Sequence, residues 1–226
     1  MNKKKTTSPA NKSKQQEVIM TIGAHNDDYI IGAGGTIAKY LAEGKRVIHI
    51  IFSYGELGNI LVKKELVRKT RFRESLDADA VLGGKDIIYL DLPETKFLEE
   101  FDKKKSFMIK VLEKYKPTRI FTHAKDDPHP DHQAVYKIVM EITSDLQWKP
   151  EVYTFDVWNL LNLKKRMNIK LIVDITPTFK KKVAAFKLHK SQKLVIFLHL
   201  WSIYLKARIA GFSHETKYAE IFYKER

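Results

Sequence analysis

Residues 18–36 read VIMTIGAHNDDYIIGAGGT, and this stretch decides the fold class. Its first six residues, Val18 to Gly23, form a short apolar run that predicts a buried β-strand. Polar residues follow, and from Ile30 to Glu43 the apolar residues recur at helical spacing until Gly44 ends the pattern. The stretch therefore predicts a strand, a polar turn and a helix in immediate succession.

The same alternation continues along the chain. Further strands are predicted at residues 46–52, 86–90, 119–122, 151–157 and 170–173. Further helices are predicted at residues 61–82, 97–115, 131–144, 177–190 and 193–209. A β-α-β-α order predicts a Rossmann-like α/β fold, a mostly parallel sheet with helices on both faces. Because no repeat or internal linker is visible, we expect a single domain over residues 17–226.

Composition limits the chemistry that the chain can carry out. None of the 226 residues is cysteine, which excludes disulfides, thiolate metal ligands and a cysteine nucleophile. Any metal must be held by nitrogen and oxygen. The net charge is +14, and five lysines without an acidic residue fall within the first fifteen positions, so residues 1–16 are predicted to be a disordered basic tail. No nucleic-acid-binding motif is visible, and no nucleic-acid partner is expected.

Two apolar features bear on location and partners. No apolar stretch follows the basic tail, so it is not a secretory signal and a cytoplasmic location is expected. The longest apolar run, Leu194 to Leu205, is interpreted as too short to span a bilayer. A buried helix or a subunit interface is the favoured interpretation, and a membrane surface is the less favoured one. The aromatic residues in this run lead us to expect a homo-oligomer.

Two dense polar clusters follow predicted strands. Residues 24–28 read AHNDD after the first strand, and residues 122–132 read THAKDDPHPDH after the fourth. Each cluster begins a helix. Ligands of open α/β sheets bind just beyond the carboxyl ends of the strands. We therefore expect the two clusters to meet at one edge of the sheet.

Together the clusters contain the ligands of a metal site. His25 and Asp28 are three residues apart at a helix start, so both side chains can face one point, and His132 can reach it from the other loop. Two histidines and one carboxylate leave a coordination position for water, which is the pattern of a catalytic zinc site. Such a metal lowers the pKa of the water towards neutrality.

The neighbouring residues supply acid–base groups. Asp27 could take the water's proton, and His129 could stabilise the oxyanion or protonate the leaving amine. Asp131 could hold the imidazole of His129 and favour its charged form. These groups suffice for amide hydrolysis without a covalent intermediate. The alternative is that Asp27 and Asp28 only cap the helix and that residues 129–132 form a polar turn.

Three further residues are candidates for substrate binding. Arg71 and Arg73 could reach a substrate, although a solvated helix face or an ion pair with Glu74 would explain them equally well. Glu56 follows the second strand and could line the site or simply belong to a turn. The glycines near residue 34 lack the Gly-x-Gly-x-x-Gly pattern, so close packing of the helix on the sheet is favoured over a dinucleotide site.

At these residues the chain resembles the LmbE-like (PIG-L) family of zinc-dependent N-deacetylases. The sequence AHNDDY at residues 24–29 is similar to the family's Ala-His-Pro-Asp-Asp-Glu, and its His-Pro-Asp-His motif is intact at residues 129–132. Similar segments are RFRE at 71–74, YLDLP at 89–93, HKSQ at 189–192 and YAE at 218–220. The resemblance runs from about Val18 to Phe222.

The resemblance implies both an activity and the roles of individual residues. It implies His25, Asp28 and His132 as Zn²⁺ ligands, although another divalent metal would suit the same donors. It also implies Asp27 as general base and His129 at the oxyanion or leaving group. The expected reaction removes an acetyl group from a small N-acetylglucosamine-type substrate, and another small N-acyl compound is the alternative.

Two positions depart from the family's first motif. Asn26 stands where the family has proline, and Tyr29 stands where it has glutamate. Neither is an expected ligand or base, so we expect catalysis to survive both changes. Tyr29 is expected to alter the rim of the pocket or the layer behind the ligands. The resemblance also implies that oligomers are common.

Overall fold

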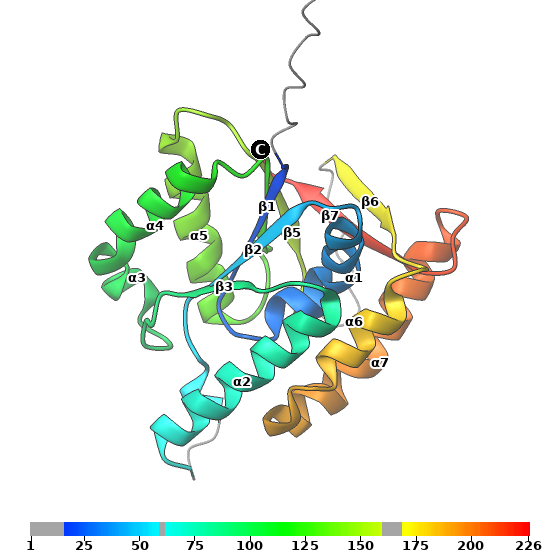
Figure 1. The fold of residues 1–226 in the computed structure, drawn as a ribbon, viewed down its shortest axis with the longest axis horizontal. Helices are drawn as coiled ribbons and strands as arrows, with labels where there is room; N and C mark the ends of the chain where they lie inside the picture. The colour runs from blue at the N-terminus through cyan, green and yellow to red at the C-terminus, as the bar shows by residue number, and fades with distance from the viewer. Residues whose placement is uncertain (1–15, 59–61, 160–168) are drawn as a thin grey trace, which may run out of the picture.

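The computed structural model describes residues 16–58, 62–159 and 169–226 (Figure 1). The strands in these residues are β1 (Val18–Gly23), β2 (Arg46–Ile51), β3 (Asp86–Tyr89), β4 (Arg119–His123), β5 (Glu151–Phe155), β6 (Lys170–Asp174) and β7 (Ala219–Lys224). The α-helices are α1 (Asp28–Ala42), α2 (Lys64–Leu82), α3 (Phe97–Glu100), α4 (Asp102–Tyr115), α5 (Pro130–Asp145), α6 (Phe179–Phe186) and α7 (Lys193–Phe212). The predicted tail lies outside the described residues except for Gln16, whose side chain donates to the Gly44 carbonyl.

The strands form one sheet in the order β3-β2-β1-β4-β5-β7-β6. Strands β1 to β5 are parallel, and β7 pairs antiparallel with both β5 and β6. The predicted Rossmann-like, mostly parallel fold is therefore confirmed. The strand order reverses between β1 and β4, and an open α/β sheet binds its ligands in the crevice at such a point.

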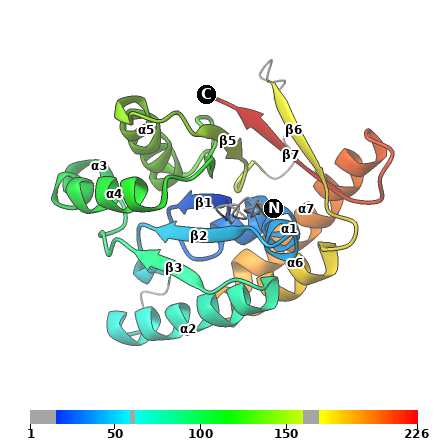
Figure 2. The ribbon, with the colours of Figure 1, turned by 45° about the horizontal axis from the view of Figure 1, so that its top comes forward.

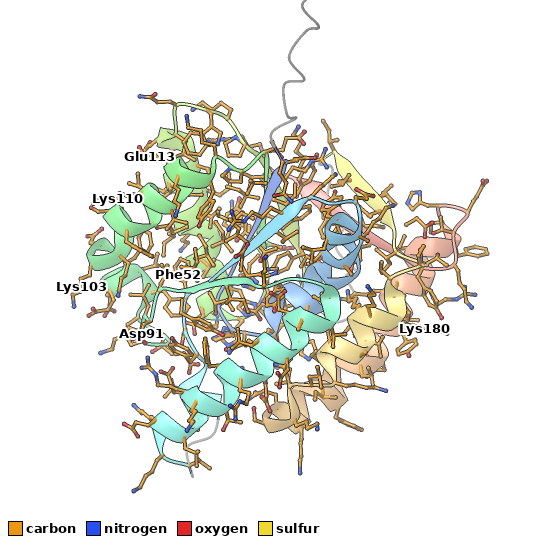
Figure 3. All side chains as sticks on the ribbon, viewed as in Figure 1. Phe52, Asp91, Lys103, Lys110, Glu113 and Lys180 are labelled. Carbon is orange, nitrogen blue, oxygen red and sulfur yellow. The ribbon has the colours of Figure 1, made fainter. Side chains whose placement is uncertain are left out.

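Successive side chains of the central strands alternate between two apolar layers, because neighbouring residues of a strand face opposite sides of the sheet. Ile19 and Val47 belong to the layer under α1, α2, α6 and α7, whereas Met20 and Ile48 belong to the layer under α4 and α5. Figure 2 shows these two groups of helices on opposite faces. Helix α4 presents Lys103 and Lys110 to solvent on its outer side (Figure 3).

Helix α1 lies unusually close to its neighbours because two of its residues lack side chains. A Cβ atom on Gly32 would lie 2.3 Å from the Phe155 ring, and one on Gly35 would lie 2.7 Å from Ile175. Contacts this short are not tolerated. The glycines therefore serve close helix–sheet packing, as their sequence pattern indicated.

A buried ion pair between Glu220 and Lys182 forms hydrogen bonds with the backbone in the middle of α1. The Glu220 carboxylate, from β7, accepts hydrogen bonds from the backbone nitrogens of Gly35 at 3.0 Å and Thr36 at 2.8 Å. Lys182, from α6, donates to the Ile31 carbonyl at 2.8 Å and to Glu220 at 2.6 Å. This pair binds β7 and α6 to the helix that begins at the predicted metal site.

Several elements differ from the sequence prediction. The helix predicted at 97–115 is split at Phe101, where the Lys104 nitrogen bonds the Phe101 carbonyl in a tighter turn. Phe97 and Phe101, four residues apart, both contact the Phe52 ring. Strand β7 was not predicted at all.

Helix α7 contradicts the interpretation of its apolar run as a buried helix. Ile203 and Ala207 face the interior, but Phe197 and Phe212 are 76% and 88% exposed. Among the described residues, Lys190–Phe212 is one helical stretch whose length and apolar composition would suffice to cross a membrane, and a third of it is buried in the protein. The expectation that the segment is too short to span a bilayer is therefore wrong as to length.

The buried pair predicts a large effect on stability. Glu220→Gln should lower the free energy of unfolding by about 3–5 kcal/mol, because the Lys182 ammonium would stay buried without its counter-charge. Urea unfolding followed by circular dichroism measures this. Glu141→Gln is the control, since it removes the partner of the exposed Lys105 and should change stability little. Equal effects of the two substitutions would contradict the assignment.

Candidate metal centre and adjoining cavity

The two polar clusters meet where the neighbouring strands β1 and β4 end. The backbone nitrogen of Ala24, just after β1, donates to Nε2 of His123, the last residue of β4, at 3.0 Å. The loop after β1 carries residues 24–27 into α1, and the loop after β4 carries residues 124–129 into α5. The sheet thus brings together side chains about a hundred residues apart in sequence.

Three of these side chains converge on one point. The ligand atoms of His25, Asp28 and His132 all lie within 4.8 Å of one another. The Asp28 carboxylate is central, with one oxygen 3.6 Å from His25 Nδ1 and the other 3.3 Å from His132 Nε2. Asp28 and His132 are fully buried, and His25 is partly exposed towards a cavity.

The electrostatics of this group fit a divalent cation. His132 Nε2 is buried and has no hydrogen-bond partner among the described residues. Burial alone would lower the pKa of His132, but Asp28 and Asp127 raise it to about 9. Burial likewise opposes charge on His25, yet Asp131 and Asp28 raise its pKa to about 10. Carboxylates that attract protons so strongly attract a divalent metal at the same place, and nitrogen and oxygen donors suit zinc.

Asp127 holds the far side of His132, a role that the sequence prediction missed. Its Oδ1 lies 3.0 Å from His132 Nδ1, and its Oδ2 accepts hydrogen bonds from the backbone nitrogens of Val157 and Trp158, each at 3.1 Å. Metal-binding histidines are commonly oriented in this way by a carboxylate on the second ring nitrogen. The sequence did contain a signal, because Asp127 is part of the cluster at residues 122–132.

His123 lies against the group, with its Nε2 3.2 Å from an Asp28 oxygen. Its ring stacks on His132 with centroids 3.9 Å apart, and its Nε2 accepts the Ala24 hydrogen bond. Burial and the nearby His132 lower the pKa of His123 to about 4. His123 is therefore neutral and packs behind the three converging groups.

Asp27 occupies the N-cap position of α1, yet its side chain makes no capping hydrogen bond. The capping interpretation therefore does not account for it. The carboxylate is buried, lines the cavity beside Asp28, and has one oxygen 3.6 Å from the Arg71 guanidinium. Asp27 is thus held in the cavity.

His129 and Asp131 are arranged differently from the prediction. The Asp131 carboxylate faces His25 Nε2 at 3.3 Å and the Thr95 backbone nitrogen at 2.9 Å. The Asp131 backbone nitrogen donates to Nδ1 of His129 at 3.2 Å, and the ligand atoms of His25, His129 and Asp131 lie within 4.8 Å of one another. Asp131 favours the charged form of His129, as expected, but burial and the neighbouring histidines His132 and His25 outweigh it and lower the pKa of His129.

A cavity of about 290 Å³ opens beside the three converging side chains. Its lining includes Asp27, Arg71 and His129 on the polar side, and Val157, Trp158 and Val195 on the apolar side. Glu94 also lines it and was missed by the sequence prediction. Its carboxylate accepts from the Leu57 nitrogen at 2.8 Å and lies 3.9 Å from His25 Nε2, and burial raises the pKa of Glu94. The available signal was its position just beyond the carboxyl end of β3.

The three candidate substrate-binding residues have different positions. Arg71 is buried in the cavity wall, donates to the Gly55 carbonyl, and has an Nε atom without a hydrogen-bond partner among the described residues. Arg73 is exposed and does not line the cavity, because two residues along a helix point in nearly opposite directions. Glu56 is held by Ser53 and Arg68 near the rim and does not line the cavity either.

The two departures from the family motif lie behind the site. Asn26 is buried, and its Nδ2 contacts the Arg71 carbonyl at 3.1 Å and Ser75 Oγ at 2.8 Å. Tyr29 is buried in the apolar layer, where its ring stacks on His49 with centroids 4.0 Å apart. Of the two places expected for Tyr29, the rim of the pocket is wrong, because Tyr29 is buried and does not line the cavity. A position behind the ligands stays a prediction.

The fold and the site together define an α/β protein with a candidate two-histidine, one-aspartate metal centre beside a cavity. Residues 20–143, more than half of the chain, match the family described as GlcNAc-PI de-N-acetylase (PIG-L), and the chain belongs to this family.

Relatives and solved structures extend the comparison. The chain is 31% identical over 160 residues to mycothiol S-conjugate amidase of Streptomyces coelicolor, covering 59% of this chain and 55% of the relative. The chain thus spans about half the length of the first curated relatives it matches.

Two solved structures resemble the whole fold. One is an N,N'-diacetylchitobiose deacetylase from Pyrococcus horikoshii, with a TM-score of 0.79, 22% identity, and coverage of 93% of this chain and 84% of the other. The other is a 4-carboxy-2-hydroxymuconate hydratase from Pseudomonas putida, with a TM-score of 0.80, 19% identity, and coverage of 93% and 97%. At these identities the likeness establishes the fold alone.

The hydrogen bond between Asp127 and His132 predicts an effect on metal affinity. Asp127→Asn should weaken zinc binding roughly 10–100-fold, because the ring of His132 would lose the carboxylate that orients it. Competition with a chromogenic chelator measures the affinity. The matched control is Asp126→Asn at the neighbouring carboxylate, which belongs to none of the candidate metal-binding groups among the described residues. Unchanged affinity in Asp127→Asn would contradict the orienting role.

Proposed function

We propose that the chain is a metal-dependent hydrolase that removes an acetyl group from the amide nitrogen of an N-acetylglucosamine-type substrate. The observation that carries the proposal is the position of Asp27. A carboxylate buried in the cavity, beside a candidate metal group and not used for capping, is what a general base requires. A protein that only bound a metal would not need it.

His25, Asp28 and His132 would hold the metal, and zinc is the preferred candidate. When bound, a divalent cation there would acidify a water molecule and polarise the amide carbonyl. Asp27 would accept the water's proton, because its carboxylate lies next to Asp28 on the cavity side. Arg71, whose guanidinium lies 3.6 Å from an Asp27 oxygen, helps to keep that carboxylate in place.

His129 would donate a hydrogen bond to the oxygen that becomes negatively charged. Its Nδ1 accepts the Asp131 backbone hydrogen bond, so the proton of the neutral ring is on Nε2. A neutral Nε2–H in the cavity wall is a suitable oxyanion donor. Asp131 would act through His25, whose ring it contacts, and not through His129. Arg71, whose guanidinium lines the cavity, offers a second donor to the substrate.

Two alternatives involve the same residues. A metal amidohydrolase acting on another small N-acyl compound would use the same groups, and one relative is by name an amidase. The hydratase with the same fold adds water without cleaving an amide. Family membership favours the deacetylase, because the family description names de-N-acetylation.

Other expectations from the sequence stay predictions. The partner is proposed to be a small N-acetylated compound that contains a sugar, with no nucleic acid involved. The enzyme is proposed to be cytoplasmic and to form a homo-oligomer. Light scattering of the full chain tests the last point, because a strict monomer at micromolar concentration would refute it.

Asp27→Asn tests the proposed base. It should lower kcat by roughly 10²–10⁴-fold, the usual contribution of a positioned acid–base group, while the metal content stays unchanged. Acetate release from N-acetylglucosamine derivatives measures the rate, and elemental analysis measures the metal. His132→Ala is the contrasting variant, because it should lose the metal together with the activity.

The same assay separates the alternatives. N-acyl amino acids are tested beside the acetylated sugars. A preference for the N-acyl amino acids would favour the alternative, a metal amidohydrolase that acts on another small N-acyl compound. A fully active Asp27→Asn enzyme would exclude Asp27 as the base. Absence of amide cleavage by the zinc-loaded wild type across both substrate classes would overturn the proposed function.

A further inference from the structure

The outer face of α7 is apolar along its whole length. Leu194, Phe197, Trp201, Leu205, Ile209 and Phe212 are exposed, with Leu194 70% and Phe212 88% accessible. Their spacing of three and four residues places them in one stripe on the helix. The side that contacts the protein packs Ile203 in the core, with Val195, Ile196 and Leu200 partly buried beside it. The other buried residues of α7 are small or polar: His199, Ser202, Ala207, Ala210 and Gly211. We call the exposed set the α7 stripe.

An ordinary surface helix turns its large apolar side chains to the interior, whereas α7 carries large apolar side chains on its exposed side as well. Packing within the chain does not explain the α7 stripe, because its large side chains contribute little to either apolar layer. Apolar patches of this extent on soluble proteins mark interaction surfaces. Twenty residues give the helix a length of about 30 Å.

The helix is suited to lying along a surface and not to crossing it. Ile203 is part of the apolar layer, and the Phe179 ring of α6 packs on Tyr204 with centroids 4.9 Å apart. Pulling α7 into a bilayer would break these contacts. Its exposed side alone is available.

The charges around the α7 stripe identify the kind of partner. Residues 175–214, which include α6 and α7, contain eight lysine and arginine residues and no aspartate or glutamate. The exposed cations among them include Lys180, Lys187, Lys193 and Arg208. Lys180 projects from α6, which runs beside α7 (Figures 1 and 3).

We propose that the α7 stripe docks the protein on an anionic lipid surface. Apolar side chains enter the headgroup region, and the surrounding cations contact lipid phosphates. A second copy fits less well, because a twofold interface would bring the lysine and arginine residues of positions 175–214 against their own copies. Gln192 and Val195, at the start of α7, line the cavity, so docking brings the cavity wall close to the lipid headgroups.

Vesicle flotation of the full chain tests this proposal. Wild type should float with vesicles of phosphatidylcholine and phosphatidylglycerol, and less with phosphatidylcholine alone. Phe197→Ser should lower the partition coefficient about tenfold or more, from the loss of one buried aromatic side chain. Phe107→Ser, on the exposed side of α4, is the matched control and should have no effect. The basic tail is present in every variant, so it cannot cause the difference.

A charge variant completes the experiment. Lys193→Gln combined with Arg208→Gln should weaken binding to anionic vesicles by about tenfold or more and leave binding to neutral vesicles unchanged. No flotation of wild type, equal binding to both vesicle types, or equal effects of Phe197→Ser and Phe107→Ser would each overturn the proposal. Light scattering that shows Phe197→Ser dissociating an oligomer, without a change in vesicle binding, would assign the stripe to a second copy instead.

A separate observation concerns Asn26. Its buried side chain bonds the Arg71 carbonyl and Ser75 Oγ of α2, and the Arg71 guanidinium in turn reaches Asp27, the residue next to Asn26. We infer that Asn26 is a positioning residue, which fixes α2 against the metal-site loop and thereby sets Arg71 relative to Asp27. This inference rests on the proposed function.

A double-mutant cycle separates positioning from general stability. Asn26→Ala should lower kcat/KM about tenfold in the wild type and have no further effect in an Arg71→Ala background, because its effect passes through Arg71. Ser75→Ala is the control, since it leaves the contact between Asn26 and the Arg71 carbonyl in place. Additive losses of kcat/KM would overturn the inference, whereas an inactive wild type would contradict the proposed function instead.

A readout independent of activity accompanies the cycle. The Arg71 Nε–H resonance, assigned with Arg71→Lys, should shift in Asn26→Ala and stay in place in Ser75→Ala. An unshifted resonance in Asn26→Ala would overturn the positioning role even if the protein showed no turnover.

Discussion

The buried negative charge of Asp28 is the constraint on which the site depends. A carboxylate without exposure to water needs positive charge or hydrogen-bond donors close by. The structure supplies the backbone nitrogen of His25 at 2.7 Å and ring nitrogens of His25 and His132. These donors come from the loop after β1 and the start of α5, which follows β4. Because β1 and β4 are neighbours in the sheet, the strand order brings both donors to Asp28. A divalent cation would complete the same compensation.

Much of this arrangement follows from local sequence, and the exceptions have physical causes. The strands from β1 to β4 were predictable because their apolar runs are short and bounded by polar turns. Strand β7 was not, since Glu220, a charged residue, sits within it and is buried only through contacts with distant Lys182 and α1. The metal-site loops were predictable because their polar residues are dense. The roles of Asp127 and Glu94 were not predictable, because they depend on the backbone and ring atoms that the fold brings near each carboxylate. The spacing of residues in the sequence does not specify those partners.

Exposure was harder to predict than secondary structure. An apolar run such as α7 has the same composition whether it is buried, shared with a partner or open to solvent. Arg71 and Arg73 have the same chemistry two residues apart, and only the orientation of α2 decides that Arg71 lines the cavity. The fold resembles both a deacetylase and a hydratase, so the fold alone does not determine the reaction. Function depends on the side chains of the site and not on the sheet beneath it.

The insertion of Glu220 into α1 has a consequence for biosynthesis. Helix α1 leaves the ribosome well before β7, which carries Glu220. Until β7 emerges, the amide groups of Gly35 and Thr36 and the ammonium of Lys182 lack their buried acceptor. Helix α1, although it begins at the metal site, therefore reaches its finished packing only after β7 has been translated. A nascent chain that stalls before β7 would present an incomplete helix to the quality-control machinery of the cell.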